Sequence, residues 1–205
     1  ERLQSRGTNQ ALAEELALGI AYEPKVEGVH ETAAFVADKL RSFGADEIVT
    51  GIGRTGVVAV IKGRTDTKGR VIGLRADMDA LPITEASGVN YASTVPGKMH
   101  ACGHDGHTAI LLGVAQYLTE TRNFDGTAVL IFQPAEEGGA GGLAMVEDGL
   151  MGRWNIQEVY CLHNSPGIPV GPFAIPPGPL LGFLDQLELE VRGKGGHAAA
   201  LQHAV

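Results

Sequence analysis

The sequence predicts an α/β fold in which a mixed, mostly parallel sheet is flanked by helices. Short apolar runs rich in β-branched residues alternate along the chain with segments whose apolar residues recur at helical spacing. Glycine is frequent, with 29 in 205 residues, as tight connections between strands and helices require. The hydrophobic content of 44% beside 20% charged residues is typical of a globular protein and not of a disordered chain.

Helices are predicted where apolar residues recur every three to four positions. The clearest helix covers residues 31–43, whose apolar face is followed by Gly44 as a stop signal. Residues 9–20 and 107–121 show the same pattern and are also expected to be helical. We expect these helices to flank the sheet.

Strands are predicted where short runs are rich in apolar and β-branched residues. The runs expected to form strands cover residues 56–62, 71–74, 127–132, 158–162 and 187–191. The last run alternates with polar residues, whereas nearly continuous apolar runs indicate strands buried on both faces. The proline-rich stretch over residues 165–179 is predicted to be a loop that separates the main domain from the segment after it.

Charge and cysteine content exclude several classes of protein. The formal net charge of −8 argues against binding to nucleic acid, which requires a basic surface. The two cysteines, Cys102 and Cys161, imply no disulfide framework. No apolar run approaches the length of a membrane span, and no signal-peptide pattern opens the sequence. We therefore expect a cytoplasmic protein without nucleic-acid or membrane partners.

One glycine motif is better interpreted as a turn than as a nucleotide site. Residues 51–56 read GIGRTG and match the G-x-G-x-x-G pattern of dinucleotide-binding proteins. That fingerprint must follow a strand and open a helix, whose N-terminus receives the pyrophosphate. Here it opens the β-rich run VVAVI, so we predict a hairpin or a loop and no nucleotide cofactor.

The densest group of metal-ligand residue types lies in residues 99–107, which read MHACGHDGH. This segment holds three histidines, one cysteine and one aspartate, with two glycines among them. Thiolate, imidazole and carboxylate are the ligands that divalent transition metals select. The alternative is an ordinary polar turn before the helix expected at His107.

Three apolar strands are followed by residues of the same chemical types. Asp77 and Asp79 follow the strand over residues 71–74, Glu136 and Glu137 follow residues 127–132, and His163 follows the strand expected to end at Leu162. In open α/β sheets, sites form in the crevice beyond the carboxyl ends of the strands. These side chains are therefore expected to converge at one edge.

Local spacing suggests which of these residues can bind a metal together and which can act as a base. In extended backbone Cys102 and His104, two positions apart, point to one side and can reach one metal centre. The adjacent Glu136 and Glu137 then point to opposite sides, so that one ligates while the other stays available as a base. The spacing does not say which of the two is the ligand.

Five segments together resemble one family of enzymes. They read RADMDALP from Arg75, HACGHDGHT from His100, QPAEEGG from Gln133, LHN from Leu162 and GGHAA from Gly195. This ordered set is similar to the amidohydrolase branch of the aminoacylase and carboxypeptidase metallopeptidases, which includes hippurate hydrolase, N-acyl-amino-acid amidohydrolases and plant auxin-conjugate hydrolases. The resemblance implies a zinc-exopeptidase-like catalytic domain.

The resemblance also implies a two-metal centre. Cys102, His104, Glu137 and His163 match the metal ligands of the family. The family uses zinc, manganese, nickel or cobalt, and this set of donors does not choose among these metals. The implied substrate is an N-acyl or N-aroyl amino acid.

Three further residues match the family's catalytic positions. Glu136 matches the general base and acid, which takes the proton of a metal-activated water and returns it to the leaving amine. His197 matches a lid-domain histidine that polarises the substrate carbonyl, often across a dimer, so we expect a homo-oligomer. Asp79 matches a carboxylate that orients the site.

The resemblance divides the chain into a catalytic part over residues 1–180 and the start of a lid over residues 181–205. Family members continue after the lid and return to the catalytic domain, where they supply a last histidine ligand. The alternative in this sequence is that His203 takes the place of that ligand. We expect a fragment of a metal-dependent amidohydrolase. The alternative is a truncated fold that keeps a metal site but serves as a non-catalytic binding or assembly protein.

Overall fold

The computed structural model describes residues 29–169, 171–182, 187–190, 192–195, 197 and 199. The expected helix over residues 9–20 and the alternative ligand His203 lie outside these residues. The described residues fall into two compact units, one that ends at Ser165 and one that begins at Pro166. The predicted domain boundary at residue 180 stays a prediction.

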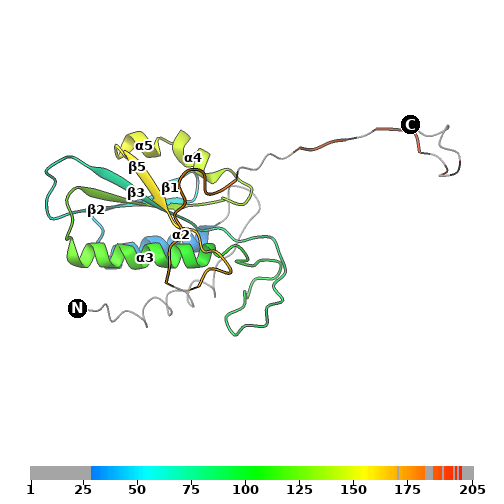
Figure 1. The fold of residues 1–205 in the computed structure, drawn as a ribbon, viewed down its shortest axis with the longest axis horizontal. Helices are drawn as coiled ribbons and strands as arrows, with labels where there is room; N and C mark the ends of the chain where they lie inside the picture. The colour runs from blue at the N-terminus through cyan, green and yellow to red at the C-terminus, as the bar shows by residue number, and fades with distance from the viewer. Residues whose placement is uncertain are drawn as a thin grey trace. The chain divides into compact units, whose positions relative to one another are not determined.

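The first unit contains one mixed sheet, which confirms the predicted fold class (Figure 1). Its strands are β1 (Glu47–Ile52), β2 (Gly56–Lys62), β3 (Val71–Asp77), β4 (Thr127–Gln133) and β5 (Glu158–Cys161). Their order in the sheet is β1-β2-β4-β3-β5. β3 runs parallel to both β4 and β5, whereas β2 runs antiparallel to both β1 and β4.

Helices cover both faces of the sheet, as Figure 1 shows. α2 (His30–Phe43) and α3 (His104–Thr121) lie on one face, and the short α4 (Gly141–Glu147) and α5 (Leu150–Arg153) lie on the other. Alternate residues of the central strands therefore enter two cores. Leu130 packs with residues of α2 and α3, whereas Val129 packs with residues of α4 and α5. Burial on both faces explains why β2 and β4 are almost continuously apolar.

Four local features differ from the sequence predictions. β1 was not expected, because its sequence, EIVTGI, lacks a clear apolar pattern, and Ile52 is its one buried residue. α3 begins at His104 and not at His107, because Gly103 adopts a left-handed φ of 98° that turns the chain into the helix three residues earlier. α4 and α5, of 7 and 4 residues, are too short to show a helical period. Residues 187–190, expected to be a strand, carry no regular structure.

The glycine motif over residues 51–56 forms the connection of the β1–β2 hairpin, as predicted. Ile52 pairs with Gly56 across a three-residue turn in which Gly53 has a φ of 60°. Among the described residues, no helix combines the length and apolar character needed to cross a membrane.

Candidate metal centre

The carboxyl ends of β3, β4 and β5 lie at one edge of the sheet, because these strands run parallel. Asp79 follows β3, Glu136 and Glu137 follow β4, and His163 follows β5. α3 begins with His104 beside this edge, since His104 contacts Asp79. The predicted convergence of these segments is therefore what the structure shows.

Three groups of side chains among the described residues bring metal-ligand atoms together, and two of them contain the predicted ligands. The ligand atoms of Cys102, His104 and His163 lie within 4.8 Å of one another, and so do those of His104, Glu136 and Glu137. Cys102 Sγ is 3.5 Å from His163 Nε2. Because His104 belongs to both groups, the five residues form one cluster, which we call the metal centre.

The chemistry of these donors fits divalent cations. His104 Nε2 and Glu137 Oε1 are buried, 3.8 Å apart, and neither has a hydrogen-bond partner among the described residues. Two buried polar atoms left unpaired are costly unless a ligand satisfies them. Burial lowers the pKa of His104, but Asp79, Asp77 and Glu137 outweigh it and raise this pKa. Positive charge is therefore favoured at this point.

Asp79 holds two members of the metal centre in place and is itself almost fully buried. Its backbone and side-chain oxygens accept from His104 Nδ1 at 2.9 and 3.2 Å, so the lone pair of His104 is on Nε2. Its Oδ2 accepts from the backbone N–H of Glu137 at 2.9 Å. Burial raises the pKa of Asp79, but these hydrogen bonds outweigh burial and lower it. Asp79 therefore fixes the His104 ring and the Glu137 backbone, and its expected role as an orienting carboxylate stays a prediction.

The two adjacent glutamates do not point to opposite sides, so the expectation based on extended backbone is wrong. Residues 136–138 form a turn, and the carboxylates of Glu136 and Glu137 both lie within 4 Å of His104 Nε2. Ala135, which precedes them, has a left-handed φ of 51° that bends the chain out of β4. The turn therefore delivers both carboxylates to one centre.

The cysteine and the exposed glutamate have shifted acidities. Burial, followed by the charge of Glu137, raises the pKa of the Cys102 thiol to about 11. A cation bound there must therefore displace a proton. Burial also raises the pKa of Glu136; the charge of His104 opposes this change and the charge of Glu137 supports it. A raised carboxyl pKa suits a group that exchanges protons near neutral pH.

Beside the metal centre lies a buried network of residues to which the sequence assigned no specific role. His107 Nδ1 is 2.6 Å from Asp77 Oδ1, and Arg75 donates to Asp77 Oδ2 at 2.7 Å. Burial raises the pKa of Asp77, but His107 and Arg75 outweigh it and lower the pKa to about 2. The i, i+2 spacing of Asp77 and Asp79 was the available signal, because Asp77 shares the edge of the sheet with Asp79.

His197 belongs to the second unit, apart from the residues described above. Its side chain is exposed, and Nδ1 accepts from the backbone N–H of Ala199 at 3.1 Å. These contacts do not test its expected role at the substrate carbonyl, which stays a prediction.

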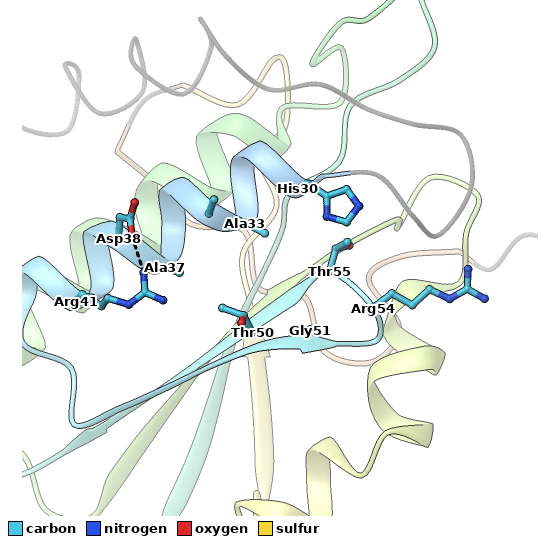
Figure 2. A pocket seen from close by; sticks show the side chains of 10 residues that line it. His30, Ala33, Ala37, Asp38, Arg41, Thr50, Gly51, Arg54 and Thr55 are labelled. Carbon is cyan, nitrogen blue, oxygen red and sulfur yellow. Dashed lines mark hydrogen bonds and ion pairs between the residues drawn. The ribbon is translucent and has the colours of Figure 1, made fainter.

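Two pockets lie outside the five residues of the metal centre. One, of about 360 Å³, opens between α2 and the β1–β2 hairpin; in Figure 2 His30, Thr55 and Arg54 stand around it. Because Val57 pairs with Phe132, this hairpin turn lies at the same edge of the sheet as the end of β4. A second pocket, of about 230 Å³, is lined by His100, whose ring nitrogens have no hydrogen-bond partner within the described chain.

Comparison with known proteins identifies the family. The sequence pattern of peptidase family M20/M25/M40 matches residues 73–204, and the chain belongs to this family. Hippurate hydrolase of Campylobacter jejuni is 47% identical over 174 residues, which cover 84% of this chain and 44% of the relative. N-acetylcysteine deacetylase of Bacillus subtilis is 45% identical over 153 residues, or 74% of this chain and 39% of the relative.

Solved structures agree with this assignment. A dinuclear metal binding peptidase of the M20 family from Bacillus subtilis has a TM-score of 0.72 and 38% identity. The matched region covers 80% of this chain and 44% of the chain of that peptidase. An aminobenzoyl-glutamate utilization protein from Klebsiella pneumoniae has a TM-score of 0.62 and 26% identity, over 81% and 45% of the two chains. The chain spans less than half the length of these relatives.

Proposed function

We propose that this protein is part of a metal-dependent hydrolase that cleaves the amide bond of N-acyl or N-aroyl amino acids. The observation that carries the proposal is the approach of the Glu136 carboxylate, within 4 Å, to the buried Nε2 of His104, which has no hydrogen-bond partner in the part of the chain that the structure describes. A potential base thus stands beside atoms suited to hold a cation. The activities for which the relatives are named, hippurate hydrolase and N-acetylcysteine deacetylase, support this substrate class.

In this proposal Cys102, His104, Glu137 and His163 hold two divalent cations, which are zinc, manganese, nickel or cobalt. Bound cations polarise a water molecule and the scissile carbonyl. Glu136 accepts the proton of the attacking water and delivers it to the nitrogen of the leaving amine. Its half-exposed carboxylate can meet both the water and the substrate, whereas Glu137 is more deeply buried.

Two residues complete the proposed mechanism. Asp79 fixes the ring of His104 and the backbone of Glu137, and so keeps the geometry constant while Glu136 moves a proton. His197 supplies a hydrogen bond to the carbonyl oxygen, where negative charge develops. We further propose a cytoplasmic homo-oligomer, on the basis of the family resemblance.

The test measures metal content and turnover on the same preparation. Protein loaded with Zn²⁺ or Mn²⁺ is assayed with hippurate, N-acetyl amino acids and an indoleacetyl amino acid, and amine release is followed. We expect bound metal and hydrolysis of at least one substrate. Cys102→Ser should lose metal, whereas Cys161→Ser, at an exposed cysteine outside the metal centre, should retain it.

Two outcomes contradict the proposal in different ways. Metal binding without turnover of any substrate supports a non-catalytic binding or assembly protein. Native protein that retains no divalent metal contradicts both interpretations, because each depends on the metal centre.

A further inference from the structure

The ligand-type side chain of His163 is not held by the packing of its strand. β5 has four residues, all exposed, and His163 is exposed as well. An exposed imidazole just beyond the end of a short edge strand can adopt several rotamers and two tautomers. Some other interaction must therefore fix the ring if it is to present Nε2 to a cation.

A chain of hydrogen bonds reaches His163 from the interior. It starts at Asp77, whose carboxylate accepts from Arg75 through Oδ2 and contacts His107 Nδ1 through Oδ1. A carboxylate can only accept, so the proton of His107 is on Nδ1 and its Nε2 is an acceptor. Asp77 and His107 are both almost fully buried, which holds this pair rigidly.

The acceptor on His107 fixes the position of Asn164. The backbone N–H of Asn164 donates to His107 Nε2 at 3.0 Å. The side-chain Oδ1 of Asn164 lies 2.6 Å from the same nitrogen, and because an oxygen only accepts, this contact becomes a hydrogen bond to the lone pair of Nε2 only with the amide turned so that its NH₂ group faces the ring. His107 thus ties the residue after His163 to the first turn of α3.

The last link sets the tautomer of His163. The backbone oxygen of Asn164 lies 2.6 Å from His163 Nδ1 and accepts a hydrogen bond from the N–H at this position. The lone pair of His163 is then on Nε2, the atom 3.5 Å from Cys102 Sγ. Removing a hydrogen-bond partner that fixes the tautomer of a ligating histidine typically changes metal affinity 10- to 100-fold.

We infer that the buried Asp77–His107 pair is a positioning device that acts through Asn164 to hold His163 as a metal ligand. This inference rests on the proposed function, because it assumes that the metal centre binds cations. It assigns a role to two residues that make up, with His104, a third group of ligand-type atoms. In this role Asp77 and His107 act on the centre from outside it.

Two substitutions at one position separate the two hydrogen bonds of His107. His107→Asn places an amide near Nδ1 and keeps the contact to Asp77, but it loses the contact to Asn164. His107→Gln extends to the position of Nε2 and can accept from the backbone N–H of Asn164. We expect about 10- to 100-fold weaker Co²⁺ binding for His107→Asn, with substantial recovery in His107→Gln.

A readout on metal-free protein isolates the positioning role. Long-range ¹H–¹⁵N spectra of imidazole rings should show His163 protonated on Nδ1 in the native protein and as a mixture of tautomers in His107→Asn. In the Co²⁺ form, the thiolate-to-metal absorption from Cys102 should persist while the ligand-field bands change. His100→Asn, at another histidine of the same segment, should leave the His163 tautomer as in the native protein.

The outcomes separate the inference from the proposed function. Native protein that binds no Co²⁺ contradicts the proposed function. Native protein that binds Co²⁺, together with a His107→Asn variant of unchanged affinity and unchanged His163 tautomer, overturns the inference alone. Circular dichroism and thermal unfolding verify that each variant is folded before these measurements are compared.

Discussion

Glu136 and Glu137 are neighbours in the chain but differ in how firmly they are held. The side chain of Glu137 is 18% exposed, its Oε1 is buried, and its backbone N–H donates to Asp79. The side chain of Glu136 is 44% exposed. A ligand must keep its position, whereas a base must reach water and substrate. These surroundings favour Glu137 as the ligand and Glu136 as the base.

This difference predicts opposite effects of matched substitutions. Glu137→Gln should lower the bound metal content, because a neutral amide replaces a charged donor oxygen. Glu136→Gln should retain metal but lose hydrolysis by about 10²- to 10⁴-fold, the range typical for removing an acid–base group. Metal analysis and initial rates on both variants check this, and the reverse pattern would exchange the two roles.

At the scale of elements, the turn between β4 and α4 positions both glutamates. Gly141, the first residue of α4, passes so close to this turn that an added Cβ would lie 1.6 Å from the backbone oxygen of Pro134. The backbone N–H of Gly141 also donates to Ala135 at 3.1 Å. Only glycine allows the start of α4 to close the turn in this way.

Gly141→Ala should therefore disturb the glutamates from outside the metal centre. We expect a loss of about 1–3 kcal/mol in the free energy of unfolding, as for other overpacked sites, together with weaker metal binding. Gly138→Ala is the matched control, because its Cβ meets nothing within 4 Å. Denaturant unfolding and metal titration check both variants, and equal behaviour of the two would argue against this account.

A second link between elements joins the C-terminal ends of α2, α3 and β2. The Arg122 guanidinium contacts Asp46 Oδ2 at 2.5 Å and donates to the backbone oxygens of Lys62 and Gly44 at 3.0 Å. Asp46 also accepts from the backbone N–H of Lys62 at 2.7 Å. Burial raises the pKa of Asp46, but the hydrogen bonds and charges of Arg122 and Lys62 outweigh burial. The pKa of Asp46 is therefore lowered from 3.8.

The direction of this shift predicts how stability depends on pH. Because the folded pKa lies below 3.8, the ionised carboxylate stabilises the fold above about pH 4, and this contribution is lost as the pH falls further. Asp46→Asn should cost about 1 kcal/mol at pH 7 and progressively less below pH 4. Urea unfolding across this pH range measures the loss in the free energy of unfolding. The control is Asp38→Asn, at an exposed ion pair, for which we expect little change in this free energy.

At the scale of the whole molecule, the parallel core and its edge could be predicted from the sequence. Runs such as residues 127–132 are apolar after their first residue, Thr127, and the candidate ligand and acid–base residues follow within a few positions. The turn at Ala135 could not be predicted, because its left-handed φ results from contacts with α4. The link from Asp77 to Asn164 could not be predicted either. The two residues are 87 positions apart in the sequence, and they lie close together only because β3 and β5 are neighbours in the sheet.

The exposed strand β5 has a consequence for the order in which the molecule opens. β5 pairs with β3 alone in the described sheet and is followed at once by His163. A cation bound to His163 and to His104 of α3 ties this outermost strand to the interior, so the strand can separate only after the cation leaves. At 100 times the dissociation constant, this linkage is worth about 2.7 kcal/mol. We expect the paired amides of β5 to exchange with deuterium up to about 100-fold more slowly with Zn²⁺ than without it, while those of β2 change little. Equal exchange rates in β5 with and without metal would show that the strand opens independently of the centre.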